Sequence, residues 1–245
     1  MILVTRTGRL IVNETKRIGR DNLMLILSVY PILLGVVGKF LVPFLRSSLL
    51  DRFDLLPHYP GIFTFFILAN PFIYGAVAAF SLLDEREENI LNAIRITPVK
   101  LSTYLLSKIV FIMLVSIVSG MLITAYMGLV EISILESFVI NSLMAFLAPF
   151  NMMLINSFSK NRVEGFALVK GTGFMILLPV VAFYVPSPLN LFFGVIPGYW
   201  PAMAIYKLTN PGFSGMPYWG YILLGLVYIL IVTRLLYNKF SKKLH

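Results

Sequence analysis

Residues 84–108 read DEREENILNAIRITPVKLSTYLLSK, and this polar stretch interrupts the most apolar part of the chain. Apolar side chains dominate residues 61–83 before it and residues 109–130 after it. Each flanking segment is long enough to cross a bilayer, which takes about 20 apolar residues. A loop that only connects two membrane spans needs just a few polar residues. The length and charge of residues 84–108 therefore indicate more than a simple connection.

The centre of this stretch has the pattern of a short amphipathic helix. Ile90, Leu91 and Ile94 recur at helical spacing and share one face. Pro98 ends the pattern, because the residue before a proline is disfavoured in helical conformation. The opposite face carries Glu87, Glu88, Asn92 and Arg95. Two interpretations remain open, a solvated loop with a run of charges and a helix that docks onto a soluble partner.

The composition places the chain in a membrane. Of its 245 residues, 58% are apolar and only 13% are charged, and the mean hydropathy is +0.87. Soluble domains contain about 25% charged residues. The formal charge of +9 then reflects loops beside anionic lipid headgroups rather than nucleic acid. The chain has no cysteine, which excludes disulfides and thiolate chemistry.

The fold class that follows is an all-α integral membrane protein with six transmembrane helices, organised as a single transmembrane domain over residues 1–245. The spans are predicted from hydropathy and from the positions of charges and prolines. They cover residues 22–44, 61–83, 102–130, 138–157, 166–185 and 217–237.

Two further segments flank these spans. Residues 5–20 alternate apolar and basic side chains, which suits either an amphipathic helix in the membrane surface or a frayed basic tail. Residues 186–216 are apolar but broken by prolines and glycines, so short re-entrant helices on the outer side are expected between spans five and six. An aromatic belt at that interface is predicted from the two tryptophans, Trp200 and Trp219, and four nearby tyrosines, Tyr199, Tyr206, Tyr218 and Tyr221.

The distribution of basic residues predicts the orientation. Of the 20 Lys and Arg residues, only Lys39, Arg46, Arg52 and Lys207 fall on one side of the predicted spans, and the other sixteen fall on the side of the N-terminus. The positive-inside rule then puts both termini and residues 84–108 in the cytoplasm, with the protein in the cell membrane.

The chain lacks the residues of several catalytic classes. Its two histidines, His58 and His245, are not spaced as metal ligands, and no phosphate-binding GxxxxGK[ST] loop is present. No acid falls in the middle of a span, where proton-coupled carriers usually have one. An enzyme is therefore disfavoured, and any energy for transport must come from another protein. Polar residues do interrupt two spans, at Asn70 and Tyr74 and at Asn151, and they mark either structural kinks or a substrate pathway.

The layout and one motif resemble the permease subunits of type-2 ABC exporters, and most closely those that export drugs. In that family the loop between spans two and three has acidic residues, a short helix with leucine and arginine, Thr-Pro, and a lysine in span three. The matching residues are Glu85, Arg86, Glu87, Glu88, Leu91, Arg95, Thr97, Pro98 and Lys108. The glycine that usually follows the glutamates is Asn89 here.

The resemblance implies half of a transporter rather than an enzyme. Two copies of an ABC ATPase subunit, which would hold ATP and Mg, would drive a pair of permease subunits, identical or different; this chain itself would hold no cofactor and no metal. Residues 5–20 would form a connecting helix and residues 84–102 the coupling-helix loop, in which residues 87–97 would be the coupling helix. The residues implied in coupling are Glu85, Glu87, Glu88, Leu91, Arg95, Thr97 and Pro98, and those implied in the pathway are Asn70, Tyr74 and Asn151.

The expected function is ATP-driven export of a hydrophobic or amphipathic compound, such as a drug, lipid or peptide, across the cytoplasmic membrane. The alternative is a membrane scaffold or assembly component of an envelope complex that transports nothing. A P-loop ATPase encoded beside this chain would favour the first.

Overall fold

The computed structural model describes residues 29–30, 33–96 and 100–243, with only the backbone described at Arg95. Every regular element in these residues is a helix. Five helical stretches are long and apolar enough to cross a membrane, and each coincides with a predicted span. They are Leu56–Glu87, Leu101–Met127, Ile134–Phe158, Arg162–Tyr184 and Tyr218–Lys243. The all-α membrane fold is thereby confirmed.

The remaining predictions near the N-terminus fall largely outside the described residues. The amphipathic helix over residues 5–20 lies wholly outside them. The first span, residues 22–44, is described only in its second half, which is helical through the π-helix η1 (Val37–Leu41) and α3 (Val42–Leu49). Lys39 lies over the Tyr126 ring at 4.3 Å from its centroid.

The second span is longer than predicted. Helix α4 runs over Tyr59–Glu87, because the acidic residues after Leu83 continue the helix instead of ending it. At 1.5 Å per residue its 29 residues extend about 44 Å. Pro71 lies inside the helix. The charged residues at the end of α4 therefore belong to the same continuous helix as the membrane span and extend it beyond the apolar segment.

The fourth span is two helices rather than one. Helix α7 (Ile134–Ala145) begins at a capping box between Ser133 and Glu136, and α8 (Leu147–Phe158) follows after Phe146. Pro149 explains the interruption, because a proline lacks the N–H that would bond Ala145 and its ring crowds that carbonyl. The amide of Phe146 bonds instead to the Leu143 carbonyl at 3.2 Å.

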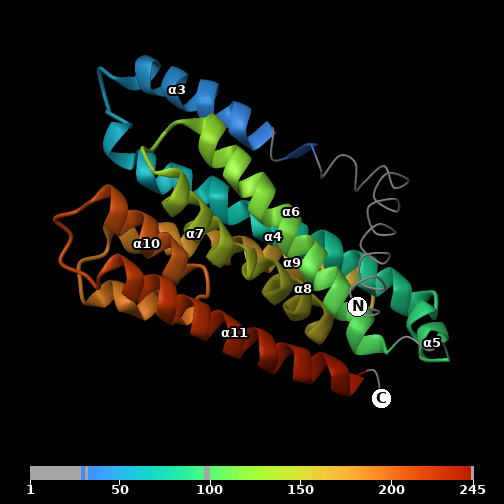
Figure 1. Cartoon of the computed structure of the whole chain (residues 1–245). Helices are drawn as coiled ribbons and strands as arrows, with labels where there is room; N and C mark the ends of the chain where they lie inside the picture. Colours follow the sequence, from blue (N-terminus) through green and yellow to red (C-terminus); the bar gives the residue numbers. More distant parts are fainter. Residues whose placement is uncertain (1–28, 31–32, 97–99, 244–245) are drawn as a thin grey trace.

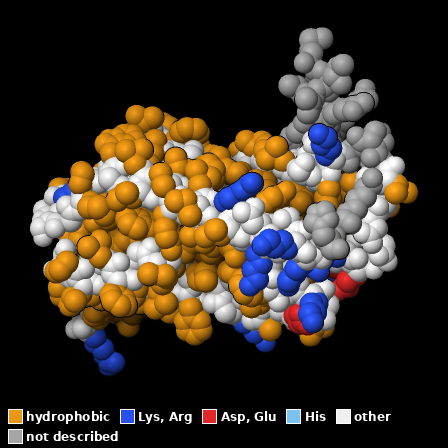
Figure 2. Space-filling model, turned by 90° about the horizontal axis from the view of Figure 1, so that it is seen from below, with side chains coloured by type: hydrophobic (Ala, Val, Ile, Leu, Met, Phe, Trp, Pro, Cys, Tyr) orange, Lys and Arg blue, Asp and Glu red, His pale blue; other side chains and the backbone are white. Residues whose placement is uncertain are grey.

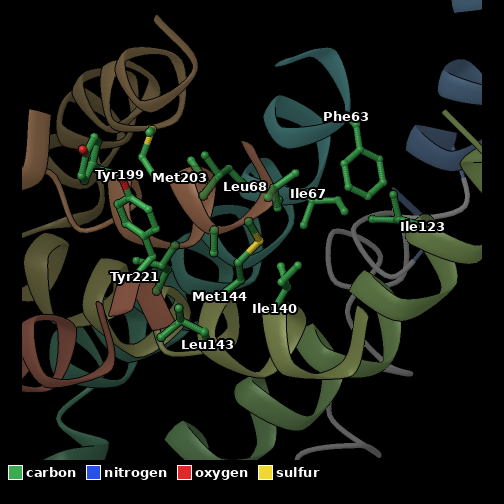
Figure 3. Packing of buried hydrophobic residues seen from close by; sticks show 14 of the residues in the cluster. Phe63, Ile67, Leu68, Ile123, Ile140, Leu143, Met144, Tyr199, Met203 and Tyr221 are labelled. Carbon is green, nitrogen blue, oxygen red and sulfur yellow. The ribbon is translucent and has the colours of Figure 1, made fainter. Parts of the chain in front are cut away.

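The central helices of the bundle are α4 and α8, and the other long helices lie around them (Figure 1). These are α6 (Leu101–Met127), which Gly128 ends with φ of 63°, α9 (Arg162–Val181) and α11 (Tyr218–Lys243). A large apolar cluster joins α4, α6, α7, α10 and α11 (Figure 3). Its labelled members include Phe63, Ile67, Met144, Met203 and Tyr221.

The 3-10 helix η3 (Ala182–Tyr184) ends the fifth span. The segment between the last two spans contains two short helices, η4 (Leu189–Val195) and α10 (Tyr199–Thr209), and their re-entry into the membrane stays a prediction. The indole N–H of Trp200 donates to the Gly194 carbonyl at 3.0 Å and so holds η4 against α10. The predicted aromatic belt is wrong for Tyr199 and Tyr221, which are fully buried and pack in the core, whereas Trp219 is exposed.

The surface of the bundle is apolar along most of its length. Figure 2 shows hydrophobic side chains over much of one face, with most of the visible Lys and Arg gathered toward one side. Large exposed apolar residues occur on α3, α6, α9 and α11, for example Phe44, Leu122, Phe174 and Leu235. Such a surface is stable only against lipid or another protein.

Candidate functional site

One end of the bundle collects most of the ionised side chains that interact across helices, and we call it the charged end. There α4 and α11 end, α6 and α9 begin, and α5 (Ile90–Arg95) lies between α4 and α6. We call residues 84–96 the elbow, which comprises the last turn of α4, Asn89 and α5 (Figure 1). The elbow contains most of the residues that the sequence predicts to contact a partner.

Glu85 lies on the inward face of the elbow. Its Oε1 is 2.8 Å from Lys108 Nζ on α6, and the exposed fractions of the two side chains are 0% and 3%. Tyr104 donates its hydroxyl to the same oxygen at 2.9 Å, and Lys108 also donates to Ser81 Oγ at 3.1 Å. Two charges removed from water in this way must stay paired, because each alone would bear a large desolvation cost. The sequence places Glu85 among the partner-contacting residues, but in this structure it fixes α4 to α6.

Asp84 and Glu87 connect the elbow to the start of α9. Arg162 Nη1 lies 3.2 Å from Asp84 Oδ2, and the backbone amide of Arg162 donates to Glu87 Oε1 at 3.0 Å. A carboxylate beside the first amides of a helix is favoured by unsatisfied N–H groups and the helix dipole. Asn161 adds an N-cap, since its Oδ1 accepts from the amide of Glu164 at 2.9 Å. Displacement of the elbow would therefore also displace the first turn of α9.

Asn89 makes the bend between α4 and α5. Its φ of 59° and ψ of 17° are in the left-handed region, which glycine adopts freely and asparagine tolerates better than most residues. The glycine of the resembled family at this position is thus explained by backbone geometry. The predicted single helix over residues 87–97 is corrected accordingly: Glu87 belongs to α4, and α5 covers only Ile90–Arg95.

Helix α5 is amphipathic, as its sequence indicates. Leu91 is 3% exposed and packs among apolar residues of α4, α6 and α11, whereas Glu88 and Asn92 are exposed. Ile96, at the end of α5, is 89% exposed, although it is apolar and the amphipathic pattern of Ile90, Leu91 and Ile94 does not include it. The side chain of Arg95 and all of Thr97 and Pro98 lie outside what the structure describes. The exposed side of the elbow therefore offers two carboxylates, two amides and one large apolar side chain.

Asn70 and Tyr74, two of the predicted pathway residues, are buried on α4. Asn70 donates from Nδ2 to the Ser116 carbonyl at 2.9 Å and accepts from Ser119 Oγ at 2.8 Å. Tyr74, one turn further along α4, is 9% exposed. Both side chains lie where α4 packs on α6, and the amide of Asn70 is satisfied there by α6.

Asn151, the third predicted pathway residue, contacts α4 from α8. Its Nδ2 donates to the Phe72 carbonyl at 2.7 Å, and the residue is fully buried. Gly75 makes this close approach possible, because a Cβ there would lie 2.5 Å from the Ala148 carbonyl oxygen. Asn70 thus contacts α6 and Asn151 contacts the α4 backbone near Tyr74, and a role for the three residues in a pathway stays a prediction.

The described residues contain no cluster of three or more His, Cys, Asp or Glu that could hold a metal ion. The ionised groups of the charged end are instead arranged in pairs across helices, Glu85 with Lys108 and Asp84 with Arg162. Each pair joins α4 to a neighbouring helix, α6 or α9.

Comparison with known proteins gives a consistent result. A family model described as "Rv2686c-like: Fluoroquinolones export permease protein Rv2686c-like" matches residues 14–237. The chain is 31% identical over 236 residues to the fluoroquinolones export permease protein MT2760 and, equally, to Rv2686c, from two strains of Mycobacterium tuberculosis. These matches cover 94% of this chain and 92% of each relative. No solved structure matches it.

Proposed function

Because this chain belongs to the Rv2686c-like family of fluoroquinolones export permeases, we propose that it is the transmembrane half of an ATP-driven drug exporter. Membership supports an export permease that spans the membrane several times. A separate ABC ATPase subunit in two copies and a second permease subunit, identical or different, complete the proposed transporter. ATP and Mg bind on the ATPase, and this chain carries no cofactor.

The elbow is the part of the chain that we assign to the ATPase. Glu88, Asn92 and Ile96 are exposed there, and the buried Leu91 anchors α5 to the bundle. A partner that binds the exposed side of α5 would displace this helix together with the residues that pack on Leu91. Because Asn89 joins α5 directly to α4, the end of α4 would move with it. The single observation that carries this assignment is the amphipathic packing of α5, whose Leu91 is 3% exposed while Glu88 and Asn92 on its other side are open to solvent beyond the spans.

The proposed orientation puts the charged end in the cytoplasm of the cell membrane. The exposed apolar faces of α3, α6 and α11 then lie against lipid, and α10 with η4 lies toward the outer side, where it dips into the membrane and returns. The count of basic residues supports this orientation through the positive-inside rule.

The substrate that we propose is an amphipathic aromatic drug. The relatives that share 31% identity over nearly the whole chain are named for fluoroquinolone export. Nucleotide binding at the ATPase would shift the permease between two states by its different affinity for them, and the elbow would carry this shift to the spans.

The test is to co-express the chain with the P-loop ATPase encoded beside it, purify the complex in lipid nanodiscs and measure drug-stimulated ATP hydrolysis. The double variant Glu88→Ala/Arg95→Ala should fold normally and lose stimulated hydrolysis by about tenfold, which corresponds to the loss of roughly one charge-assisted contact.

The matched control is Asp51→Ala/Arg52→Ala, which removes an exposed acid and an exposed base at the opposite end of the bundle. It should leave hydrolysis unchanged. If the two double variants behave alike, the elbow is not the coupling site. If no ATPase co-purifies with the wild-type chain, the alternative of a non-transporting scaffold is favoured.

A further inference from the structure

A groove opens between α6 and α11 near the charged end of the bundle. Both helices pack on α8, on either side of it (Figure 1), and the fully buried Met153 of α8 forms the floor of the groove. Its volume is about 360 Å³, which is at the small end of the range for ligand sites in proteins. Leu106 and Leu230, which line it from the two helices, are exposed, so the groove opens onto the surface of the bundle.

The two walls of the groove change from polar to apolar in the same direction. Helix α6 begins and α11 ends at the charged end, so the two helices run antiparallel along the groove. On α6, Ser102 lies in the first turn, and Ile109 lies about 10 Å further into the span. On α11, Tyr237 and Arg234 lie toward the charged end and Leu230 lies deeper. The groove is therefore polar at its end near the membrane surface and apolar within the span.

Arg234 is the one charged side chain that lines the groove. It is exposed, and its guanidinium lies 5.5 Å from the centroid of the Tyr237 ring. Among the described residues no carboxylate pairs with it, in contrast to Lys108 and Arg162, which are paired with acids of α4. Thr233 lines the groove beside it, and the Thr233 hydroxyl is buried with no hydrogen-bond partner in the described chain. The polar end of the groove thus offers a cation and a hydroxyl that the described residues leave unsatisfied.

The surface around the groove faces hydrocarbon. Helix α6 continues from Leu106 with the exposed Leu114 and Leu122, and α11 is exposed at Val227, one turn deeper than Leu230. Apolar faces of this kind on membrane helices lie against lipid tails. A ligand in the groove would therefore be in contact with the bilayer on its open side, and its apolar part would lie deeper than its charged part.

We propose that this groove binds an anionic phospholipid, with the phosphate at Arg234 and one acyl chain between Leu106 and Leu230. Arginine binds phosphate with two parallel hydrogen bonds, and basic pockets between membrane helices are typical sites for anionic headgroups. A free phosphate would leave the apolar walls uncovered, whereas a phospholipid has its charge and its chains in the order that the groove requires. The lipid would connect α6 to α11 across α8. This inference depends on neither the ATPase nor the exported compound.

The experiment measures lipid binding to the full chain, purified in detergent and depleted of lipid. The chain is titrated with dioleoyl phosphatidylglycerol, with dioleoyl phosphatidylcholine and with inorganic phosphate, and bound molecules are counted by native mass spectrometry. Arg234→Gln removes the charge, Arg234→Lys keeps it without the planar guanidinium, and Leu106→Trp fills the groove while the charge remains. The matched controls lie outside the groove on the same two helices, Lys242→Gln on α11 and Leu122→Trp on α6.

We expect the wild-type chain to bind one phosphatidylglycerol about tenfold more tightly than phosphatidylcholine, which is the effect of one charge-assisted contact. Arg234→Gln should abolish this preference and Arg234→Lys should keep part of it. Leu106→Trp should weaken the binding of phosphatidylglycerol although the charge is present, because the acyl chain loses its place. Both controls should behave like the wild type, and inorganic phosphate should compete poorly.

Several results would overturn the proposal. A preference that survives Arg234→Gln, or that Lys242→Gln removes equally, would mean that surface charge in general holds the lipid. Unchanged binding in Leu106→Trp would place the lipid outside the groove. Efficient displacement of the lipid by inorganic phosphate would identify a site for free anions, and displacement by norfloxacin at similar concentration would identify a drug site.

Discussion

Helices α4 and α9 are neighbours with similar composition and different surroundings. Both are long, apolar and interrupted by a proline, Pro71 or Pro179, and they run antiparallel from the contact between Asp84 and Arg162. Nearly every side of α4 is buried by α6, α8 and α9, whereas α9 exposes a full stripe. Apolar character alone therefore does not tell which span is central in the bundle and which lies at its edge.

The space around the glycines of the two helices shows the same difference in burial. At Gly75 on α4 an added Cβ would lie 2.5 Å from the Ala148 carbonyl oxygen and 2.9 Å from Asn151 Cβ. At Gly171 and Gly173 on α9 it would meet nothing. Glycine serves close packing at Gly75 of α4 and at Gly165 of α9, where an added Cβ would lie 2.9 Å from Leu83, whereas Gly171 and Gly173 of α9 leave an open surface.

The largest loss of stability should come from substituting Glu85, and its neighbour Asp84 serves as the comparison. Glu85→Ala leaves the ammonium of Lys108 buried without its carboxylate and should cost about 3–5 kcal/mol of stability. Asp84→Ala removes a pair that is 30% and 42% exposed and should cost less than about 1 kcal/mol. Thermal unfolding of both variants in detergent measures the difference. Equal melting temperatures would mean that the contact to α6 is no stronger than the contact to α9.

A smaller effect is expected from the glycines. Gly75→Ala pushes α4 away from the α8 backbone and should destabilise by about 1–3 kcal/mol. Gly171→Ala has room for its methyl group and should stabilise α9 by up to about 1 kcal/mol through helix propensity. Chemical denaturation in the same detergent tests the opposite signs. Destabilisation by both substitutions would contradict the open surface on α9.

The smallest effect should come from Asn151→Leu, which removes the hydrogen bond to the Phe72 carbonyl. Hydrogen bonds between membrane helices contribute about 0.6 kcal/mol on average and up to about 1.7 kcal/mol. Export assays on this variant also address the predicted pathway role. Export that stays normal at slightly reduced stability would show that Asn151 only joins α8 to α4; lost export at normal stability would restore it to the pathway.

Much of this architecture follows from local patterns in the sequence. Hydropathy locates the five described spans, and the spacing of Ile90, Leu91 and Ile94 indicates α5 and its buried face. The break between α7 and α8 was also available in principle, because Pro149 lies well inside the predicted fourth span. The end of α4 does not follow from hydropathy, because a run of acids marks the edge of the apolar segment whereas the helix continues to Glu87.

The site was less predictable, because its chemistry depends on pairing between distant residues. Glu85 and Glu88 belong to the same acidic run, yet one is buried against Lys108 and the other is open to solvent. Whether a glutamate of this run is buried or exposed depends on how α4 is rotated and shifted against α6. A single sequence does not give that register. The exposed face of α9 likewise needed the structure, since nothing in its local sequence tells which side of the helix is covered.

The seam between α4 and α8 has a mechanical consequence. Gly75 lies against the backbone of Ala148, and Asn151 and Asn156 each donate to a carbonyl of α4, at Phe72 and at Ala79. If one helix slid along the other, the Gly75–Ala148 contact and both asparagine hydrogen bonds would be lost at the same time. Helices packed this closely have no well-packed arrangement at a partial shift. The pair must therefore move as one rigid body, and any hinge that opens and closes this protein has to lie where the peripheral helices meet it.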